Sequence, residues 1–183
     1  VGLANIELPA CAKRHIKVIP ATGANAESVA EYVVGAAVTL TRGFIPATVA
    51  TLKGDWPRPR FSGYHEFLGQ TLGIVGFGSI GRIVAKKANA FGLKCVAYDP
   101  MLSGDSVNLD GFSVPLLRLT ELLSESNAVS LHLPFLPETK NLFNAVTLDQ
   151  MKKGACLINT SRGGIVDEIA LADRLRSGRI GGA

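Results

Sequence analysis

Short apolar runs alternate along the chain with longer stretches in which apolar residues recur every three or four positions. The runs at 71–75, 93–98, 128–133 and 155–159 predict buried strands, and shorter strands are expected at 112–114 and from Arg179 onward. Helical spacing covers 80–91 and 116–123, and Asp167 can cap a further helix that contains Leu171 and Leu175 and ends at Gly178. Strands that alternate with helices predict an α/β fold with a doubly wound parallel sheet.

The first third of the chain is less regular. A short strand is expected at 17–20, and Asn25 can cap a helix that runs to Arg42 and ends at Gly43. The apolar residues of this helix lie on almost every side, as in a helix held between domains or subunits. From 44 to 67 the period is lost, and prolines and glycines accumulate. Two interpretations stay open for this segment: an arm that embraces a partner, with Trp56 exposed, or a long loop folded back on its own domain.

The strand at 71–75 runs into a Gly-x-Gly-x-x-Gly motif, formed by Gly76, Gly78 and Gly81, where the next helix begins. In a dinucleotide site the first glycine allows a tight turn, the second lets the backbone approach a pyrophosphate, and the third lets the helix pack close to the sheet. The N–H groups at the helix start are then free to bind phosphate. The same glycines could instead serve only the packing of a ligand-free sheet.

Asp99 ends the following strand, 18 positions after Gly81. An acid at about this spacing accepts hydrogen bonds from the adenosine ribose hydroxyls and repels a 2′-phosphate, so Asp99 favours NAD over NADP. No arginine directly follows it to reverse that preference. Because Asp99 precedes Pro100, it could also be only a turn residue.

Ligands of such sheets bind outside the carboxyl ends of the strands. This rule predicts a crevice formed by the glycine turn, Asp99, His132 to Pro134 and Thr160 to Gly164. In the last of these segments Arg162 stands among small residues, and a planar guanidinium can hold a carboxylate through two hydrogen bonds. The alternative is an ordinary surface arginine in a turn.

Composition narrows the class of protein. With 183 residues, 47% of them hydrophobic, the chain can bury a substantial core, and it has no apolar run long enough to span a bilayer and no secretory signal at 1–10. Cys11, Cys95 and Cys156 form no Cys-x-x-Cys pair, which argues against a disulfide framework or a metal site and favours a reducing cytoplasm. The net charge of +4 is dispersed, so no nucleic-acid surface is indicated, and an anionic cofactor or substrate accounts for its sign.

Five motifs, spread over nearly the whole chain, together resemble the D-isomer-specific 2-hydroxyacid dehydrogenases. They lie at 2–6, 25–31, 73–81, 129–139 and 158–168. The resemblance implies a Rossmann fold that binds NAD, with Ser79 and Ile80 at the cofactor phosphates and Leu133 and Thr139 along its path. It places three consecutive residues beside the nicotinamide: Thr160, Ser161 and Arg162.

The resemblance also bears on the chemistry. Arg162 matches the catalytic arginine that binds the substrate in this family, whose 2-oxo acids carry the carboxylate that a guanidinium would hold. His132, together with Leu133 and Pro134, belongs to the strand-end motif around the cofactor and is not expected to donate the proton. His15 and His65 lie at no predicted strand end, so neither is assigned a catalytic role.

The same resemblance predicts the domain organisation. Residues 1–24 are expected to form the junction with the substrate domain, and 25–183 the NAD-binding domain, in which 26–67 supplies a linking helix and a candidate dimer arm. Parts of the substrate domain are expected to be missing, and the catalytic acid and histidine to lie beyond Ala183, so the chain alone should bind NAD(H) but turn over poorly. Ala4 stands where an aspartate is common, a change expected to affect only local hydrogen bonding.

The predicted function is that of a cytoplasmic NAD-dependent oxidoreductase, a homodimer that transfers a hydride between NAD(H) and a small D-2-hydroxy acid or 2-oxo acid. No nucleic-acid or membrane partner is expected. Two alternatives remain: an NAD(H)-sensing binding protein like the corepressors that share these motifs, and a nucleotide-binding pseudoenzyme.

Overall fold

The central element of the fold is a parallel sheet of four strands in the order β2-β1-β5-β6. A computed structural model describes residues 3, 5–56, 58–64 and 66–183, so that Ala4 and His65 lie outside the described residues. The strands are β1 (Thr71–Val75), β2 (Lys94–Tyr98), β5 (Ala128–Leu131) and β6 (Cys156–Asn159). All three pairings between neighbouring strands are parallel, which confirms the predicted α/β fold.

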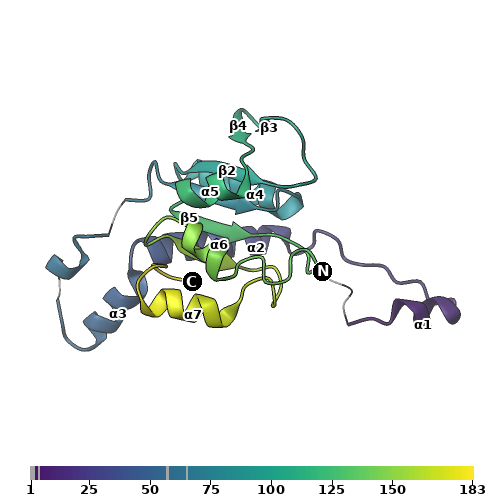
Figure 1. The fold of residues 1–183 in the computed structure, drawn as a ribbon, viewed down its shortest axis with the longest axis horizontal. Coiled ribbons are helices and arrows are strands. Elements are labelled where there is room, and N and C mark those ends of the chain that lie inside the picture. Colours follow the sequence, from purple (N-terminus) through teal and green to yellow (C-terminus); the bar gives the residue numbers. More distant parts are fainter. Residues whose placement is uncertain (1–2, 4, 57, 65) are drawn as a thin grey trace.

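Helices cover both faces of this sheet (Figure 1). Helices α2 (Ala26–Thr41) and α4 (Ser79–Ala90) pack together and enclose one buried cluster, into which β1 points Leu72 and Ile74. Helices α5 (Leu119–Glu125), α6 (Ala145–Gln150) and α7 (Glu168–Arg176) contribute to the second cluster, which contains Val75. The alternation of β1 between two apolar clusters explains why its sequence is apolar throughout.

The order of the strands creates a switch point at β1. The chain passes from β1 through α4 to β2 on one side, and then crosses back through α5 to β5, which pairs with the other side of β1. The carboxyl ends of β1 and β5 are therefore neighbours, and the two connections leave them in opposite directions. In open α/β sheets this is the place where ligands bind.

Some connections differ from the prediction. The connection after Asp99 contains a hairpin of β3 (Ser106–Leu109) and β4 (Phe112–Pro115), which includes the predicted strand at 112–114. Asp110 and Gly111 form its turn with φ of 31° and 94°, so the sequence did carry an Asp-Gly hairpin signal. The strand predicted at 17–20 is wrong: this stretch pairs with no described strand, and Ile19 is 76% exposed.

The segment that lost its period also contains helices. Helix α3 (Phe44–Leu52) and a 3₁₀ turn, η1 (Arg58–Phe61), occupy part of the stretch expected to be irregular. Pro46 lies in the first turn of α3, where its missing N–H costs no helical hydrogen bond. Gly43 ends α2 as predicted, with a φ of 64°, and the Tyr64 ring packs where a side chain at Gly43 would lie. Trp56, after α3, is 77% exposed. Helix α3 lies at the opposite side of the molecule from α1 (Leu8–Lys13) (Figure 1).

The helix termini follow the prediction in part. The Asn25 side chain makes no capping hydrogen bond to α2, so that prediction was wrong, whereas the Asp167 carboxylate accepts from two N–H groups at the start of α7. A cap on α6, from Asn144, was not predicted. Gly178 ends α7 with a φ of 69°. The strand expected from Arg179 is reduced to a single bridge between Cys156 and Gly182.

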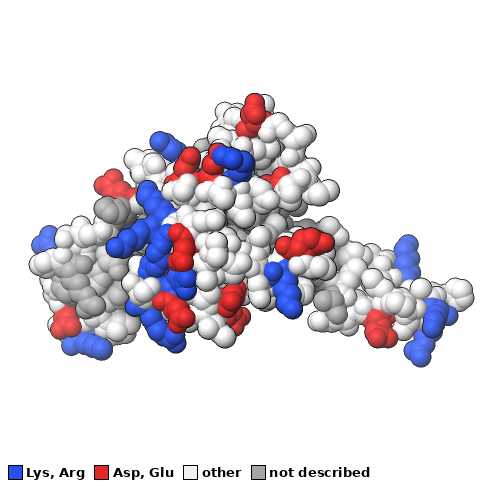
Figure 2. Space-filling model, in the orientation of Figure 1, with Lys and Arg blue, Asp and Glu red and all other residues white. Residues whose placement is uncertain are grey.

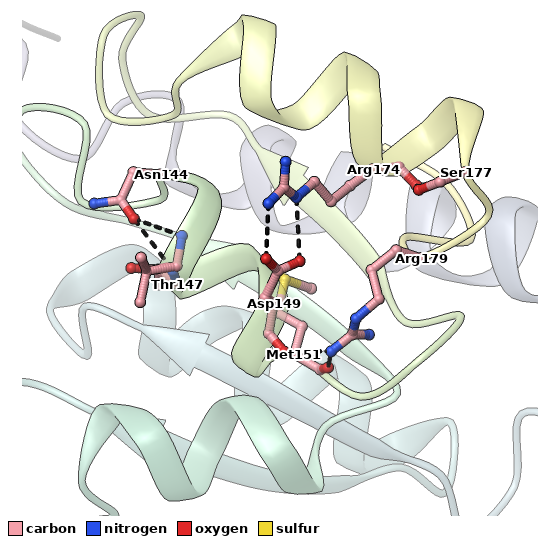
Figure 3. A network of polar contacts seen from close by, with 8 residues as sticks. Asn144, Thr147, Asp149, Met151, Arg174, Ser177 and Arg179 are labelled. Atoms are coloured by element: carbon pink, nitrogen blue, oxygen red, sulfur yellow. Dashed lines mark hydrogen bonds and ion pairs between the residues drawn. The ribbon is translucent and has the colours of Figure 1, made fainter.

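Helices α6 and α7 are joined by a polar network (Figure 3). Arg174 of α7 donates two hydrogen bonds to the Asp149 carboxylate of α6, at 3.1 and 2.7 Å. Arg179 donates to the carbonyls of Asp149 and Met151 at the end of α6. Figure 2 shows that basic and acidic side chains are interleaved on this face of the molecule rather than separated.

The described helices are short compared with the thickness of a bilayer. No single described helix is long and apolar enough to cross a membrane. Helices α2 and α3 reach the required length and hydrophobicity only as a pair, and the chain bends by 62° between them.

Candidate functional site

The glycine turn after β1 has three different steric environments. Gly76 has a φ of 92°, and a Cβ there would lie 2.6 Å from the carbonyl oxygen of His132. A Cβ on Gly81 would lie 2.4 Å from the carbonyl oxygen of Gly76, so α4 packs directly against the turn. Gly78 has no heavy atom within 4 Å of its Cβ position and immediately precedes α4. The motif therefore has two tightly packed glycines and one that is open on the side where a ligand would approach.

Asp99 connects the end of β2 to this turn. One carboxylate oxygen accepts a hydrogen bond from the Phe77 N–H at 2.8 Å, and the other accepts from the Met101 N–H at 2.9 Å. Asp99 thus has the turn role that was one interpretation of the sequence, and it also holds the glycine turn from β2. Each carboxylate oxygen can still accept a second hydrogen bond, so the predicted contact with a ribose is compatible with both roles.

A cavity of about 570 Å³ lies at the switch point. It brings together seven of the residues predicted for the site: Ile80, His132, Leu133, Pro134, Thr160, Ser161 and Arg162. Asn5, Asn25 and Val29 also line it, although no site role was predicted for them. The family motifs could have indicated these residues, because Asn5 lies in the motif at 2–6, and Asn25 and Val29 lie in the motif at 25–31. The remaining predicted residues do not line this cavity: Gly76, Gly78, Ser79, Gly81, Asp99 and Thr139.

Thr139 is engaged within its own loop. Its hydroxyl donates to the Pro134 carbonyl at 2.7 Å and accepts from the Leu136 N–H at 2.8 Å. These contacts fix the loop after His132 and Pro134. The predicted contact of Thr139 with the cofactor stays a prediction.

Asn159 organises the loop that carries Arg162. The Asn159 side-chain oxygen accepts from both the N–H and the hydroxyl of Ser161, at 3.0 and 2.7 Å, and its side-chain nitrogen donates to the Arg162 carbonyl at 2.9 Å. This role was not predicted, although an asparagine that directly ends a strand is a recognisable turn signal. These three hydrogen bonds from Asn159 fix the backbone of residues 160–162 at the wall of the cavity.

Arg162 is exposed and lies at the same wall. Its guanidinium donates to the Ser161 carbonyl at 2.7 Å, and among the described ion pairs none involves Arg162. By contrast, Arg118, Arg174 and Arg176 each pair with a carboxylate. Arg162 therefore has donors available for a carboxylate ligand.

His132 is the one titratable group of the cavity whose pKa is strongly displaced. Burial lowers the pKa of His132 from 6.5 to about 4, because the charged imidazolium is poorly solvated there. Its Nε2 lies in hydrogen-bond contact with the Ser130 hydroxyl. A neutral imidazole at physiological pH agrees with the expectation that His132 is not the proton donor.

Acidification should reveal this displaced pKa as a loss of stability. Above pH 6.5 the imidazole is neutral in the folded and unfolded states, whereas between pH 6.5 and about 4 only the unfolded chain binds the proton. The contribution of His132 to the free energy of unfolding, present above pH 6.5, should therefore fall by about 3 kcal/mol by pH 4. Denaturant unfolding of the complete protein between pH 7 and 4 should show a loss about 3 kcal/mol smaller in His132→Asn. Equal losses in the two proteins would contradict the displaced pKa.

The residues around the cavity fit a nicotinamide dinucleotide. Gly78 leaves open space at the start of α4, where unpaired N–H groups can bind phosphate. Thr160 Oγ1 is buried beside the cavity without a described hydrogen-bond partner, as expected of a group that a ligand would satisfy. A larger cavity of about 710 Å³ lies at the opposite, amino-terminal ends of the strands, near Gln70 and Asn127, and does not include any of these features.

The parallel sheet, the glycine turn and the cavity at the switch point define an α/β dinucleotide-binding domain. A family model described as "D-isomer specific 2-hydroxyacid dehydrogenase, NAD binding domain" matches residues 34–183. The chain belongs to this family, which confirms both the resemblance and the predicted Rossmann fold with NAD as its cofactor.

Similar proteins are dehydrogenases and reductases by name. (S)-Sulfolactate dehydrogenase of Chromohalobacter salexigens is 46% identical over 183 residues, which are 100% of this chain and 59% of that protein. Hydroxypyruvate reductase of Thermotoga maritima is 39% identical over 98% of this chain and 57% of its own length. The solved structure of NAD-dependent formate dehydrogenase from Staphylococcus aureus, in complex with NAD, has a TM-score of 0.87 and 35% identity, and covers 100% of this chain and 54% of that one. The chain thus spans a little over half the length of these relatives.

Proposed function

We propose that the protein containing this chain catalyses reversible hydride transfer between NAD(H) and a small D-2-hydroxy acid or 2-oxo acid. The observation that carries the proposal is an arginine with no described acidic partner, Arg162, in the wall of a cavity that also includes the first turn of α4 at Ile80. Arg162, on one wall of the cavity, supplies a group that can bind a carboxylate. Ile80, on another, belongs to the amino-terminal turn of α4, where helices bind phosphate. A small oxo acid beside a dinucleotide satisfies both.

Each residue then has a defined task. Arg162 holds the substrate carboxylate through two hydrogen bonds and polarises the neighbouring carbonyl, which fixes the carbon that changes oxidation state. The nicotinamide, when bound, supplies or accepts the hydride. Asn159 keeps the backbone around Arg162 in place.

A general acid is also required, because the substrate oxygen gains a proton during reduction. His132 is unsuitable, since its pKa of about 4 leaves it without a proton to donate as imidazolium near neutral pH. His15 does not line the cavity. We propose that the general acid belongs to a segment outside residues 1–183, as the family resemblance implies, and that this chain alone binds NAD(H) but turns over poorly.

The names of the relatives support this substrate class. They refer to sulfolactate, hydroxypyruvate and, for a protein of Synechocystis that is 40% identical over 183 residues, D-3-phosphoglycerate. Each of these compounds carries a carboxylate next to a hydroxyl or carbonyl carbon. That shared group is the one Arg162 is proposed to bind.

The wider organisation belongs to the same proposal. We infer a homodimer, because α2 and α3 expose large apolar side chains, Tyr32, Phe44, Ile45 and Leu52, and Trp56 after α3 is exposed as well. Residues 1–24 are proposed to be the junction with a substrate domain, since α1 has no buried residue. A cytoplasmic location is supported by three free cysteines, of which burial raises the pKa of Cys95 to about 12 and that of Cys156 to about 11.

Calorimetric titration of the complete protein with NADH and NADPH tests the cofactor part. NADH should bind at least about tenfold more tightly, because Asp99 would repel the 2′-phosphate of NADPH. Asp99→Asn should weaken the binding of NADH and strengthen that of NADPH, so that the preference for NADH narrows by about tenfold. Asp105→Asn, at an exposed acid in the same loop between β2 and β3, should leave this preference unchanged. A wild-type preference for NADPH, or no heat with either nucleotide, would contradict the proposal.

A further inference from the structure

Ser130 is a buried polar residue whose hydroxyl has one described partner. Ser130 lies on β5 with a relative exposure of 0%, and its Oγ contacts His132 Nε2. Among the described residues, no carbonyl or carboxylate accepts a hydrogen bond from this hydroxyl. Within the described part of the chain, the other fully buried serine is Ser126, before β5, whose hydroxyl donates to the Leu122 carbonyl at 2.6 Å.

The position of the proton on His132 follows from this environment. A serine hydroxyl always carries one hydrogen, and leaving that hydrogen unpaired in a buried site is costly. Nε2 of His132 is its one described partner, and pairing the hydroxyl hydrogen there assigns the unprotonated state to Nε2. In a neutral imidazole the proton is then on Nδ1. The lowered pKa of His132 agrees with a neutral ring in this place.

His132 lines the cavity, and its Nδ1 has no described partner within the protein. Only Thr160 Oγ1 and Arg179 Nη1 are buried without a partner among the described side chains. His132 Nδ1 has no described hydrogen-bond partner, and it is not one of these buried atoms. His132 lines the cavity, and its own carbonyl packs against Gly76 of the glycine turn.

We propose that Ser130 is a positioning residue: it holds His132 as the Nδ1–H tautomer, so that Nδ1 donates a hydrogen bond to an acceptor oxygen of the bound nicotinamide nucleotide. The inference rests on the proposed function for its ligand. A nucleotide is favoured over the oxo acid because the His132 backbone carbonyl packs against Gly76 of the glycine turn, and His132 lines the cavity together with Ile80 of the first turn of α4. A neutral donor also adds no second positive charge next to Arg162.

The tautomer can be measured without any ligand. In the complete protein labelled with ¹⁵N-histidine, two-bond ¹H–¹⁵N spectra distinguish a protonated from an unprotonated ring nitrogen. Wild type and Ser126→Ala should show His132 with unprotonated Nε2 and protonated Nδ1. Ser130→Ala removes the hydroxyl and should lose this single tautomer. Ser126→Ala is matched in chemistry and burial but lies away from His132.

Affinity for NADH, measured by calorimetry, supplies the functional readout. Ser130→Ala should lower the affinity for NADH by about three- to tenfold, the usual effect of one lost hydrogen bond. Ser126→Ala should leave this affinity unchanged. His132→Asn can place an amide donor where Nδ1 stood. In that background Ser130→Ala should cause no further loss, because no tautomer remains to be set.

The outcomes separate this inference from the proposed function. A wild-type His132 protonated at Nε2 would overturn the role of Ser130, whether or not NADH binds. Equal losses of affinity in the two serine variants would also overturn it, since a general effect of burial would then suffice. If NADH bound to none of the proteins while the spectra showed the expected tautomer, the proposed function would fail and the assignment of the proton would stand.

Discussion

Replacing Gly76 with alanine is expected to lower the free energy of unfolding by about 3 kcal/mol and to abolish measurable binding of NADH. The φ of 92° is unfavourable for any residue with a Cβ, and that Cβ would lie 2.6 Å from the carbonyl oxygen of His132. This oxygen cannot easily retreat, because the His132 N–H is hydrogen bonded to the Val75 carbonyl at 2.8 Å. Denaturant unfolding and calorimetry on the complete protein measure the two effects.

Two other glycines serve as controls for Gly76→Ala. Gly78→Ala meets no heavy atom within 4 Å, so its free energy of unfolding should stay within about 0.5 kcal/mol of wild type. Its affinity for NADH should still fall, because the methyl group occupies the space through which a phosphate approaches the backbone. Gly63→Ala is equally unhindered but lies at the opposite cavity, and should change neither quantity. Unaltered NADH affinity in Gly78→Ala would argue against a phosphate at this turn.

The sheet could be predicted from sequence because its strands are buried on both faces. Val129 and Leu131 of β5 face one cluster and Ala128 faces the other, so nearly every position in such a strand is apolar. The hairpin β3–β4 has partly exposed strands of four residues each, and its apolar pattern is too short to show a period. Helix α3 is hard to predict for another reason, because the prolines and glycines around it are typical of segments that end helices. Pro46 nevertheless lies in the first turn of α3, where proline is tolerated.

The site was predictable where one strand end supplies consecutive residues. Thr160, Ser161 and Arg162 follow the carboxyl end of β6 and line the cavity, where the rule for strand ends places them. Asn25 and Val29 reach the same cavity from α2 and the turn before it, which lie outside the alternating strands and helices, so only the tertiary packing brings them there. The tautomer of His132 was equally inaccessible to sequence, because it depends on which atoms surround one buried hydroxyl.

Arg162→Lys, made in the complete protein, should lower kcat/KM for its 2-oxo acid by about a thousandfold, equivalent to about 4 kcal/mol of transition-state stabilisation. Lysine retains the charge but cannot form two parallel hydrogen bonds to a carboxylate, and so cannot fix the adjacent carbonyl. Affinity for NADH should change by less than about threefold, because the proposed task of Arg162 is to hold the substrate. Steady-state kinetics and calorimetry together measure both quantities.

Arg174→Lys is the matched control for this substitution. Arg174 already forms two hydrogen bonds to the Asp149 carboxylate, so lysine removes the same geometry at a site between α6 and α7 that is not part of the cavity. That variant should lose up to about 1 kcal/mol of stability and keep its kcat/KM. Comparable losses of activity in both variants would show that the effect is one of folding, whereas full activity in Arg162→Lys would remove Arg162 from the chemistry. A loss of kcat/KM in Arg162→Lys alone would instead assign the binding of the substrate carboxylate to Arg162. This arginine lies at the switch point, its backbone is held by Asn159, and it has no described acidic partner.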